Sequence, residues 1–221
     1  MTGDATSRAT LRTFIALDLP DPLLDALATT QEQVQHELRG QSRALGAALR
    51  WSPTKNLHLT LRFLGDTTAA QQATITTHLH EVATHIVPFT LEVDVSGRGL
   101  GAFPNLRQPR VIWSGVTGDL AALHELQAQV EAVAQVAGFV PETKAFSPHL
   151  TLARAARDAE RRVLAQAGAA IHAYAEQTTT TAVMRFQVDR VVFYQSELGA
   201  GGSRYTMLAA LPLTSTAAPG P

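Results

Sequence analysis

A short pattern, His-x-Thr-x, occurs twice in this chain and constrains its fold more than any other feature. Both copies read HLTL, at positions 58–61 and 149–152. Successive side chains of an extended strand point to opposite faces, so each copy places a histidine and a threonine on one face and two leucines on the other. If the leucines pack on a core, the polar faces stay open. Two such strands at one cleft provide two proton carriers and two neutral hydrogen-bond donors.

The same alternation assigns a face to the residues around the first copy. Arg62 falls on the face of His58 and Thr60, whereas Phe63 falls on the leucine face together with Leu57. We therefore expect Arg62 near the histidine and Phe63 toward the core.

Composition is typical of a globular protein with a substantial core. The chain has 221 residues, of which 45% are hydrophobic, which is enough for one large domain or two small lobes. Residues 1–11 and 214–221 are mostly small and polar, which predicts two flexible tails around a single domain at 12–213.

Charge and cysteine content exclude several classes of function. The formal net charge of −1 gives no broad grip on a long nucleic acid, so such a ligand is held through a short piece only. The absence of cysteine excludes disulfides, thiolate chemistry and cysteine-bound zinc.

No apolar run is long enough to span a bilayer, and the first residues lack the apolar core of a secretory signal. We expect no membrane association and a cytoplasmic location.

Hydrophobic periodicity and turn residues predict alternating strands and helices. Strands are expected at 12–19, 57–63, 89–95, 111–116, from 149, and at 183–188, 190–194 and 205–211. Helices are expected at 21–38 with a cap at Asp21, from 67 or 68 through 82 with Thr67 or Thr68 as the cap, at 119–138 with a cap at Asp119, and at 158–174. Loops are expected at 40–49 and 97–105, and a hairpin turn at 198–202. The short final connections and the lack of a Gly-x-Gly-x-x-Gly after the first strand argue against a doubly wound parallel sheet. They favour an α+β fold of two related lobes, with mainly antiparallel sheets facing a central cleft and helices outside.

The two motif histidines differ from the others in their surroundings. Six histidines fall in helical segments with polar neighbours, where we interpret them as solvated: His36, His78, His80, His85, His124 and His172. An ordinary strand that happens to recur remains one explanation of the motif pair. A zinc site is another, but these strands carry no third ligand and threonine binds zinc poorly. A serine nucleophile is a weaker hypothesis, because Ser196 lacks the Gly-x-Ser-x-Gly elbow and a paired base.

Two histidines with two threonines suit displacement at a phosphodiester. One imidazole takes a proton from the attacking oxygen while the other gives a proton to the departing oxygen, each worth roughly 10²–10⁴-fold in rate. An imidazole titrates near pH ~6.5, so one neutral and one protonated ring coexist near neutrality. The threonine hydroxyls donate to the phosphate oxygens, and hydrogen bonds to charged groups contribute roughly 1.5–3 kcal/mol.

The chain resembles the 2H phosphoesterase superfamily, which is named for two His-x-Thr-x motifs, and within it the RNA 2′,3′-cyclic phosphodiesterases, also called 2′-5′ RNA ligases. The resemblance covers about residues 12–213, and two motifs in register with further blocks make it specific. The blocks are RTFIALDLP at 12–20, Trp51, NLHLTLRFLG at 56–65, GAFP at 101–104, PRVIW at 109–113, PHLTLAR at 148–154, SEL at 196–198 and GSRY at 202–205.

The resemblance implies a bilobal α+β fold and an enzyme that opens a terminal RNA 2′,3′-cyclic phosphate to a 2′-phosphomonoester without a metal or nucleotide cofactor. By matching position, His58 is the proton donor to the departing 3′ oxygen and His149 is the proton acceptor that activates water. Thr60, Thr151 and Arg154 bind the phosphate. Strict alternation puts Arg154 on the leucine face, so the strand must bend or end there.

The resemblance also implies a partner, an RNA 3′ end bearing a 2′,3′-cyclic phosphate, and we expect a monomer. Reverse 2′-5′ ligation would be the minor direction in water, and Arg62 a weaker electrostatic contributor. Residues that could stack on the terminal base are Phe14, Trp51, Phe103 and Tyr205. Two alternatives stay open: a phosphodiesterase for small cyclic nucleotide or sugar phosphates, and a non-catalytic protein that binds RNA ends.

Overall fold

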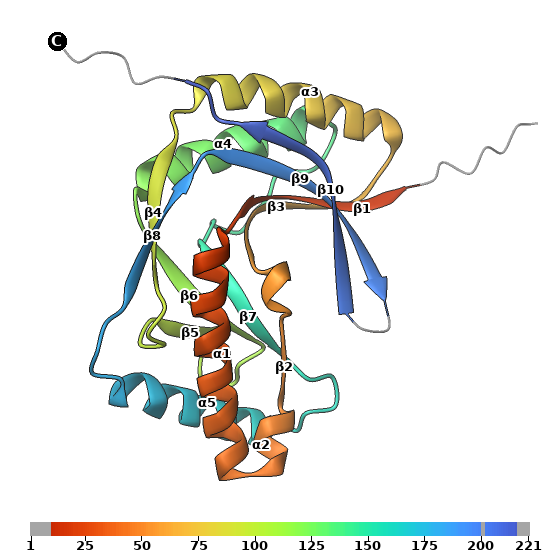
Figure 1. Ribbon diagram of the computed structural model, residues 1–221. Coiled ribbons are helices and arrows are strands. Elements are labelled where there is room, and N and C mark those ends of the chain that lie inside the picture. The colour runs from red at the N-terminus through yellow and green to blue at the C-terminus, as the bar shows by residue number, and fades with distance from the viewer. Residues whose placement is uncertain (1–9, 200–201, 216–221) are drawn as a thin grey trace, which may run out of the picture.

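The computed structural model describes residues 10–199 and 202–215. Within these residues helices and strands alternate along the chain, as Figure 1 shows. The order is β1 (Leu11–Asp18), α1 (Asp21–Gln41), α2 (Arg43–Ala47), β2 (Leu49–Trp51), the 3₁₀ turn η1 (Thr54–Asn56), β3 (His58–Thr67), α3 (Ala69–His85), β4 (Phe89–Asp94), β5 (Leu100–Phe103), β6 (Val111–Gly118), α4 (Leu120–Val136), β7 (His149–Ala155), α5 (Arg161–Gln177), β8 (Val183–Val188), β9 (Arg190–Gly199) and β10 (Gly202–Pro212).

The strands form one strongly bent sheet (Figure 1). Its order is β10-β9-β1-β3-β7-β6-β4-β8, with β2 paired to β7 and β5 paired to β6. The described strand pairs are all antiparallel. The two motif strands, β3 and β7, are neighbours at the centre of the sheet and meet where Leu59 pairs with Leu150.

Helices divide the molecule into two lobes, named here after their motif strands. In the β3 lobe, α3 and α4 pack on each other and cover β3, β9 and β10. In the β7 lobe, α1 packs on α2 and α5, which lie against β2 and β5. Figure 1 shows these two groups of helices at opposite ends of the molecule. Each lobe therefore contains a helix from the other half of the chain, since α4 lies in the β3 lobe and α1 lies in the β7 lobe.

Leucine spacing in the motifs explains how the lobes join. Leu59 and Leu61 of β3 and Leu150 and Leu152 of β7 are all buried in one large hydrophobic cluster. A second cluster fills the β7 lobe between α1, α2, α5 and the sheet, and includes Ala153. Burial of these apolar side chains contributes roughly 25 cal/mol per Å² removed from water. The expected α+β class, with an antiparallel sheet and helices outside, is confirmed.

Several expected element boundaries are wrong in detail. Part of the expected loop at 40–49 is helix α2, and part of the loop at 97–105 is strand β5. Helix α5 begins at Arg161 rather than at residue 158, and β9 and β10 extend to the hairpin turn, whose residues 200–201 lie outside the described residues. Residues 1–9 and 216–221 of the two expected tails also lie outside them.

Helix starts test the expected capping residues. The hydroxyl of Thr68 accepts from the amide of Gln71 in a capping box, and Asp119 accepts from the amide of Ala122, so both expected caps are confirmed. The expected cap at Asp21 is wrong. Pro20 occupies the N-cap position of α1, and Asp21 lies in the first turn, where its charge still favours the helix dipole.

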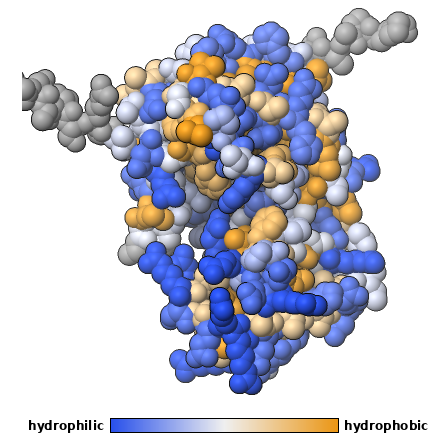
Figure 2. Space-filling view, turned by 180° about the vertical axis from the view of Figure 1, so that it is seen from behind, coloured by the Kyte–Doolittle hydropathy of each residue, from blue (hydrophilic) through white to orange (hydrophobic). Residues whose placement is uncertain are grey.

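The surface is mixed in polarity. Figure 2 shows hydrophobic side chains in small separate patches between polar ones on the face opposite to that of Figure 1. In the described part of the chain, none of the helices combines the length and the apolar character needed to cross a membrane.

Candidate active site

Two β-bulges in β3 decide which side chains share the face of His58. The register with β1 skips Leu61 and Leu64, so Ala16 pairs with Thr60 but Ile15 pairs with Arg62. Each extra residue reverses the alternation, because paired residues point to the same face. Arg62 therefore lies on the helix-covered face, not with His58 as expected. Phe63 is exposed on the other face, not in the core, with its ring centroid 5.9 Å from that of Phe14.

A third bulge, in β7, brings Arg154 to the face of His149 and Thr151. The register with β6 skips Leu152, so that Trp113 pairs with Thr151 and Val111 pairs with Arg154. The strand thus makes the bend that strict alternation required. The carbonyl of Leu152 accepts hydrogen bonds from the backbone amide of Ser52 (2.8 Å) and from Nε2 of buried Gln31 (3.0 Å), which fixes the bulge.

The two histidines lie diagonally across neighbouring strands. Because Leu59 pairs with Leu150 in antiparallel register, His58 comes next to Thr151 and Thr60 comes next to His149. Diagonal positions of this kind are about 7–8 Å apart in an antiparallel pair. All four side chains are half-buried. The structure therefore gathers both motifs into one polar centre on the seam between the lobes.

Each histidine ring is held by a carbonyl two residues before it. Nδ1 of His58 is 2.8 Å from the oxygen of Asn56, and Nδ1 of His149 is 2.7 Å from the oxygen of Ser147. A carbonyl oxygen only accepts, so Nδ1 is the protonated nitrogen in both rings. Nε2 is left as the nitrogen that binds or releases a proton. This matched anchoring fixes the tautomer and orientation of two rings in the same way.

Aromatic rings pack against both histidines. The His58 ring lies 4.8 Å from Phe14 and 5.3 Å, edge to face, from Tyr205. The His149 ring lies 4.9 Å from Phe103, also edge to face. Phe14 is only 2% exposed, so it supports His58 and has no free face for a base, and half-buried Trp51 packs on both hydrophobic clusters. Tyr205 and Phe103 remain half-buried beside the centre.

Burial and neighbouring charges set the pKa of His58. Burial is the largest effect and lowers the pKa below its ordinary value of 6.5, because it disfavours the charged ring. The hydrogen bond to Asn56 and the negative charge of Asp18 raise the pKa, while the positive charges of Arg154 and His149 lower it further. The charges of Arg154 and His149 thus act on His58, which agrees with one shared centre.

The remaining predicted phosphate ligands are accessible. In residues 10–199 and 202–215, no protein hydrogen bond of the Thr60 or Thr151 hydroxyl is found, and Arg154 is exposed without an ion-pair partner. Arg50 of β2 pairs across the strands with Arg154 and is also exposed. Like charges directly opposite each other are destabilising unless an anion lies near them. These groups together form a polar, positively charged surface beside the two histidines.

Arg62 forms ion pairs on the opposite face of β3 from His58. Its Nε forms a 2.8 Å ion pair with Glu131 of α4, and its guanidinium also contacts Glu142 (3.4 Å) and donates to the carbonyl of Val140 (2.7 Å). The side chains of Arg62 and Glu131 are only 11% and 16% exposed. Arg62 is thus neutralised by two carboxylates, and it ties the loop that leads to the second motif to β3.

A cavity of about 570 Å³ opens beside His58, between η1 and the β9–β10 hairpin. Sequence reasoning did not single out its polar lining residues Asn56, Lys55, Arg204 and Tyr194, although Asn56 and Arg204 belong to the resemblance blocks. The Tyr194 hydroxyl donates to Asp18 at 2.6 Å, and burial together with this bond raises the pKa of Tyr194. The cavity could be found only from the fold, because its lining residues come from four separate segments of the chain.

The other histidines lie where the sequence predicts. All six are on helices, and five of them are exposed, with His78 half-buried and bound to Glu81 at 2.9 Å. Among the described residues, no group of three or more histidine, cysteine, aspartate or glutamate side chains is placed to hold a metal ion.

Two related proteins found by sequence comparison carry the same name. A protein of Aquifex aeolicus named RNA 2′,3′-cyclic phosphodiesterase is 36% identical over 106 residues, which cover 48% of this chain and 54% of that protein. This match thus spans about half of that relative's length. A protein of the same name from Methanothermobacter thermautotrophicus is 30% identical over 196 residues, covering 89% of this chain and 95% of that protein.

A solved structure agrees with the sequence relatives. Escherichia coli LigT complexed with 3′-AMP superposes with a TM-score of 0.64 at 27% identity, over 93% of this chain and 99% of that chain. A sequence profile described as LigT like Phosphoesterase matches residues 17–113 and 117–205. The resemblance to the 2H phosphoesterases is therefore confirmed, and the chain belongs to the LigT-like phosphoesterase family.

Proposed function

We propose that this protein hydrolyses RNA 2′,3′-cyclic phosphate ends to 2′-phosphomonoesters by general acid–base catalysis with His58 and His149. The observation that carries this proposal is the matched anchoring of the two rings, each through Nδ1, on neighbouring strands of one centre. The names of the relatives from Aquifex and Methanothermobacter supply the substrate class.

The reaction assigns one proton transfer to each ring. Nε2 of His149 takes a proton from water as the water oxygen attacks phosphorus. The bond from phosphorus to the 3′ oxygen breaks, and Nε2 of His58 gives its proton to that oxygen, which leaves the phosphate on the 2′ oxygen. Thr60, Thr151 and Arg154 donate hydrogen bonds to the phosphate oxygens, where negative charge grows. No metal or nucleotide cofactor takes part in these steps.

The lowered pKa of His58 bears on the donor role. In the free protein this ring is mostly neutral at neutral pH, since burial disfavours the charged form. A bound cyclic phosphate carries a negative charge, which raises the pKa of a nearby imidazole. The proton of His58 is therefore taken up with the substrate and is then available for the departing oxygen.

The test uses an oligoribonucleotide that ends in a 2′,3′-cyclic phosphate, incubated with purified protein in excess chelator. The expected result is turnover to a 2′-phosphate, identified by phosphorus NMR. Turnover that stops in chelator, or a 3′-phosphate product, argues against the proposal. Binding of the oligonucleotide without turnover supports instead a non-catalytic protein that binds RNA ends.

A further inference from the structure

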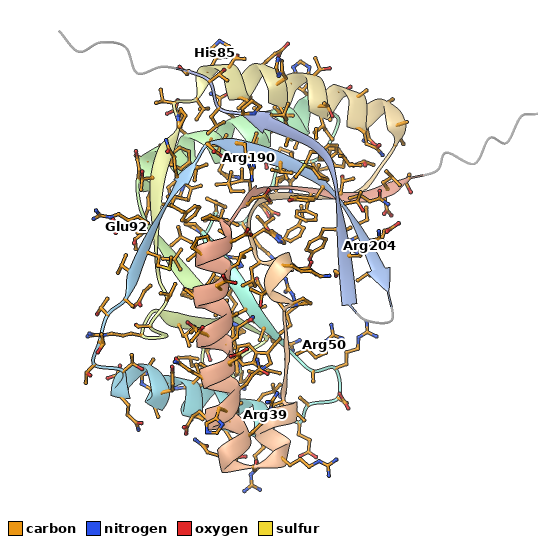
Figure 3. All side chains as sticks on the ribbon, in the orientation of Figure 1. Arg39, Arg50, His85, Glu92, Arg190 and Arg204 are labelled. Atoms are coloured by element: carbon orange, nitrogen blue, oxygen red, sulfur yellow. The ribbon has the colours of Figure 1, made fainter. Side chains whose placement is uncertain are left out.

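The cavity beside His58 carries two positive side chains that the proposed reaction does not use. Lys55 of η1 and Arg204 of β10 both line it, and both are exposed. In the part of the chain that the structure describes, neither forms an ion pair with a carboxylate. Figure 3 shows Arg204 on the same side of the molecule as Arg50 of β2.

One hydrogen bond joins the two elements that carry these side chains. Nδ2 of Asn56 donates to the carbonyl of Ser203 at 2.7 Å. Lys55 and Arg204 are the neighbours in sequence of these two residues, and both line the cavity. The carbonyl of the same Asn56 anchors the ring of His58. The two backbone segments that carry the positive side chains are therefore linked to the His58 ring through a single residue.

The carboxylate of the cavity wall already has partners of its own. Asp18, the only carboxylate among the described residues that line the cavity, accepts from the Tyr194 hydroxyl and lies 3.6 Å from Nε of Arg190. The cavity thus presents a net positive surface in a chain whose formal net charge is −1. Tyr205, half-buried in the same wall, offers an aromatic edge and face to a sugar or base.

We propose that Lys55 and Arg204 bind the backbone phosphate one nucleotide to the 5′ side of the cyclic phosphate, which makes the protein select oligonucleotide ends over mononucleoside cyclic phosphates. This inference rests on the proposed function. A cavity of about 570 Å³ lies in the size range of small-molecule sites, roughly 300–1,000 Å³, so it accommodates a nucleotide-sized group next to His58. An RNA 3′ end supplies a second phosphate there, whereas a mononucleoside cyclic phosphate does not.

The test compares a dinucleotide and a mononucleoside, each ending in a 2′,3′-cyclic phosphate. Lys55→Ala and Arg204→Ala should each raise KM for the dinucleotide about tenfold and leave kcat unchanged, because one hydrogen bond to a charged group is lost. Neither change should affect the mononucleoside. A dinucleotide with an uncharged methylphosphonate linkage should show the same loss with the unaltered protein, and no further loss with either variant.

Arg43→Ala is the matched control, since Arg43 is exposed on α2, outside the cavity. Equal effects of Lys55→Ala on both substrates, or no effect on the dinucleotide, overturn the inference while the proposed function stands. Failure of the unaltered protein to hydrolyse either substrate overturns the proposed function and this inference with it.

Discussion

The ion pair between Arg62 and Glu131 tests whether burial makes an ion pair important for the stability of this protein. Removing one partner of a buried pair leaves the other charge without compensation in a poorly hydrated place, which costs about 3 kcal/mol or more. Both side chains here are less than one-fifth exposed. Arg62→Met should therefore lower the free energy of unfolding by about 3 kcal/mol. In a chain of this size that corresponds to a fall in Tm of about 6–12 °C.

The chain contains a matched control for this change. Arg185 and Glu92 form an ion pair of nearly the same length, 2.7 Å, but Arg185 is 76% exposed. Exposed pairs contribute about 0–1 kcal/mol, so Arg185→Met should lower Tm by less than about 4 °C. Urea unfolding with a constant m-value, together with calorimetry, measures both variants.

A double variant tests the cause of the loss. Arg62→Met combined with Glu131→Gln should recover part of the stability, because the glutamine carries no charge and still accepts from the amide of Glu142. If Arg62→Met destabilises the protein no more than Arg185→Met does, the reasoning from burial is wrong.

Three further predictions concern the centre and its support. Burial lowers the pKa of His58, so as the pH falls the unfolded chain protonates this ring before the folded protein does. The free energy of unfolding should therefore decline below pH ~6.5, and it should decline less in His58→Gln. A titration midpoint of the His58 ring above 6.5, measured by NMR, contradicts this. Thr151→Val should reduce kcat/KM about 10–100-fold at unchanged Tm while Thr151→Ser keeps most activity, and equal rates of the two variants refute a role of the hydroxyl. Gly168→Ala should lower Tm, because the new Cβ would lie 1.8 Å from the Leu106 carbonyl oxygen. This clash outweighs the preference of helices for alanine over glycine, which is about 1 kcal/mol. A raised Tm contradicts this.

The sequence predicts well what depends on local pattern. The motif strands, their leucine faces and the caps at Thr68 and Asp119 all follow from the spacing of a few residues, and the structure confirms them. Strand β5 escapes prediction because it is short and contains Gly101, whose missing side chain leaves room for the Trp113 ring of β6. That requirement is tertiary and leaves no periodic pattern.

The side-chain faces near the bulges could not be predicted from alternation. The faces of Arg62 and Phe63 depend on extra residues in β3 that appear only when the strand pairs with β1. The same kind of irregularity in β7 was anticipated for Arg154, because the resemblance required the side chain on a face that alternation denied it. The cavity beside His58 could not be predicted from the sequence. It forms where η1 meets β10 through a contact between Asn56 and Ser203, which are far apart in the chain.

The central claim is that two anchored imidazoles act together on one phosphate. Its most direct test is the single-turnover rate of cyclic-phosphate opening in chelator for His58→Ala, His149→Ala and the double variant, with His172→Ala, on the exposed face of α5, as the control. We expect each motif variant to lose about 10²–10⁴-fold in rate, the double variant to lose less than the product of the two, and the control to react normally. Rates of either motif variant within a few-fold of the unaltered protein would contradict the account.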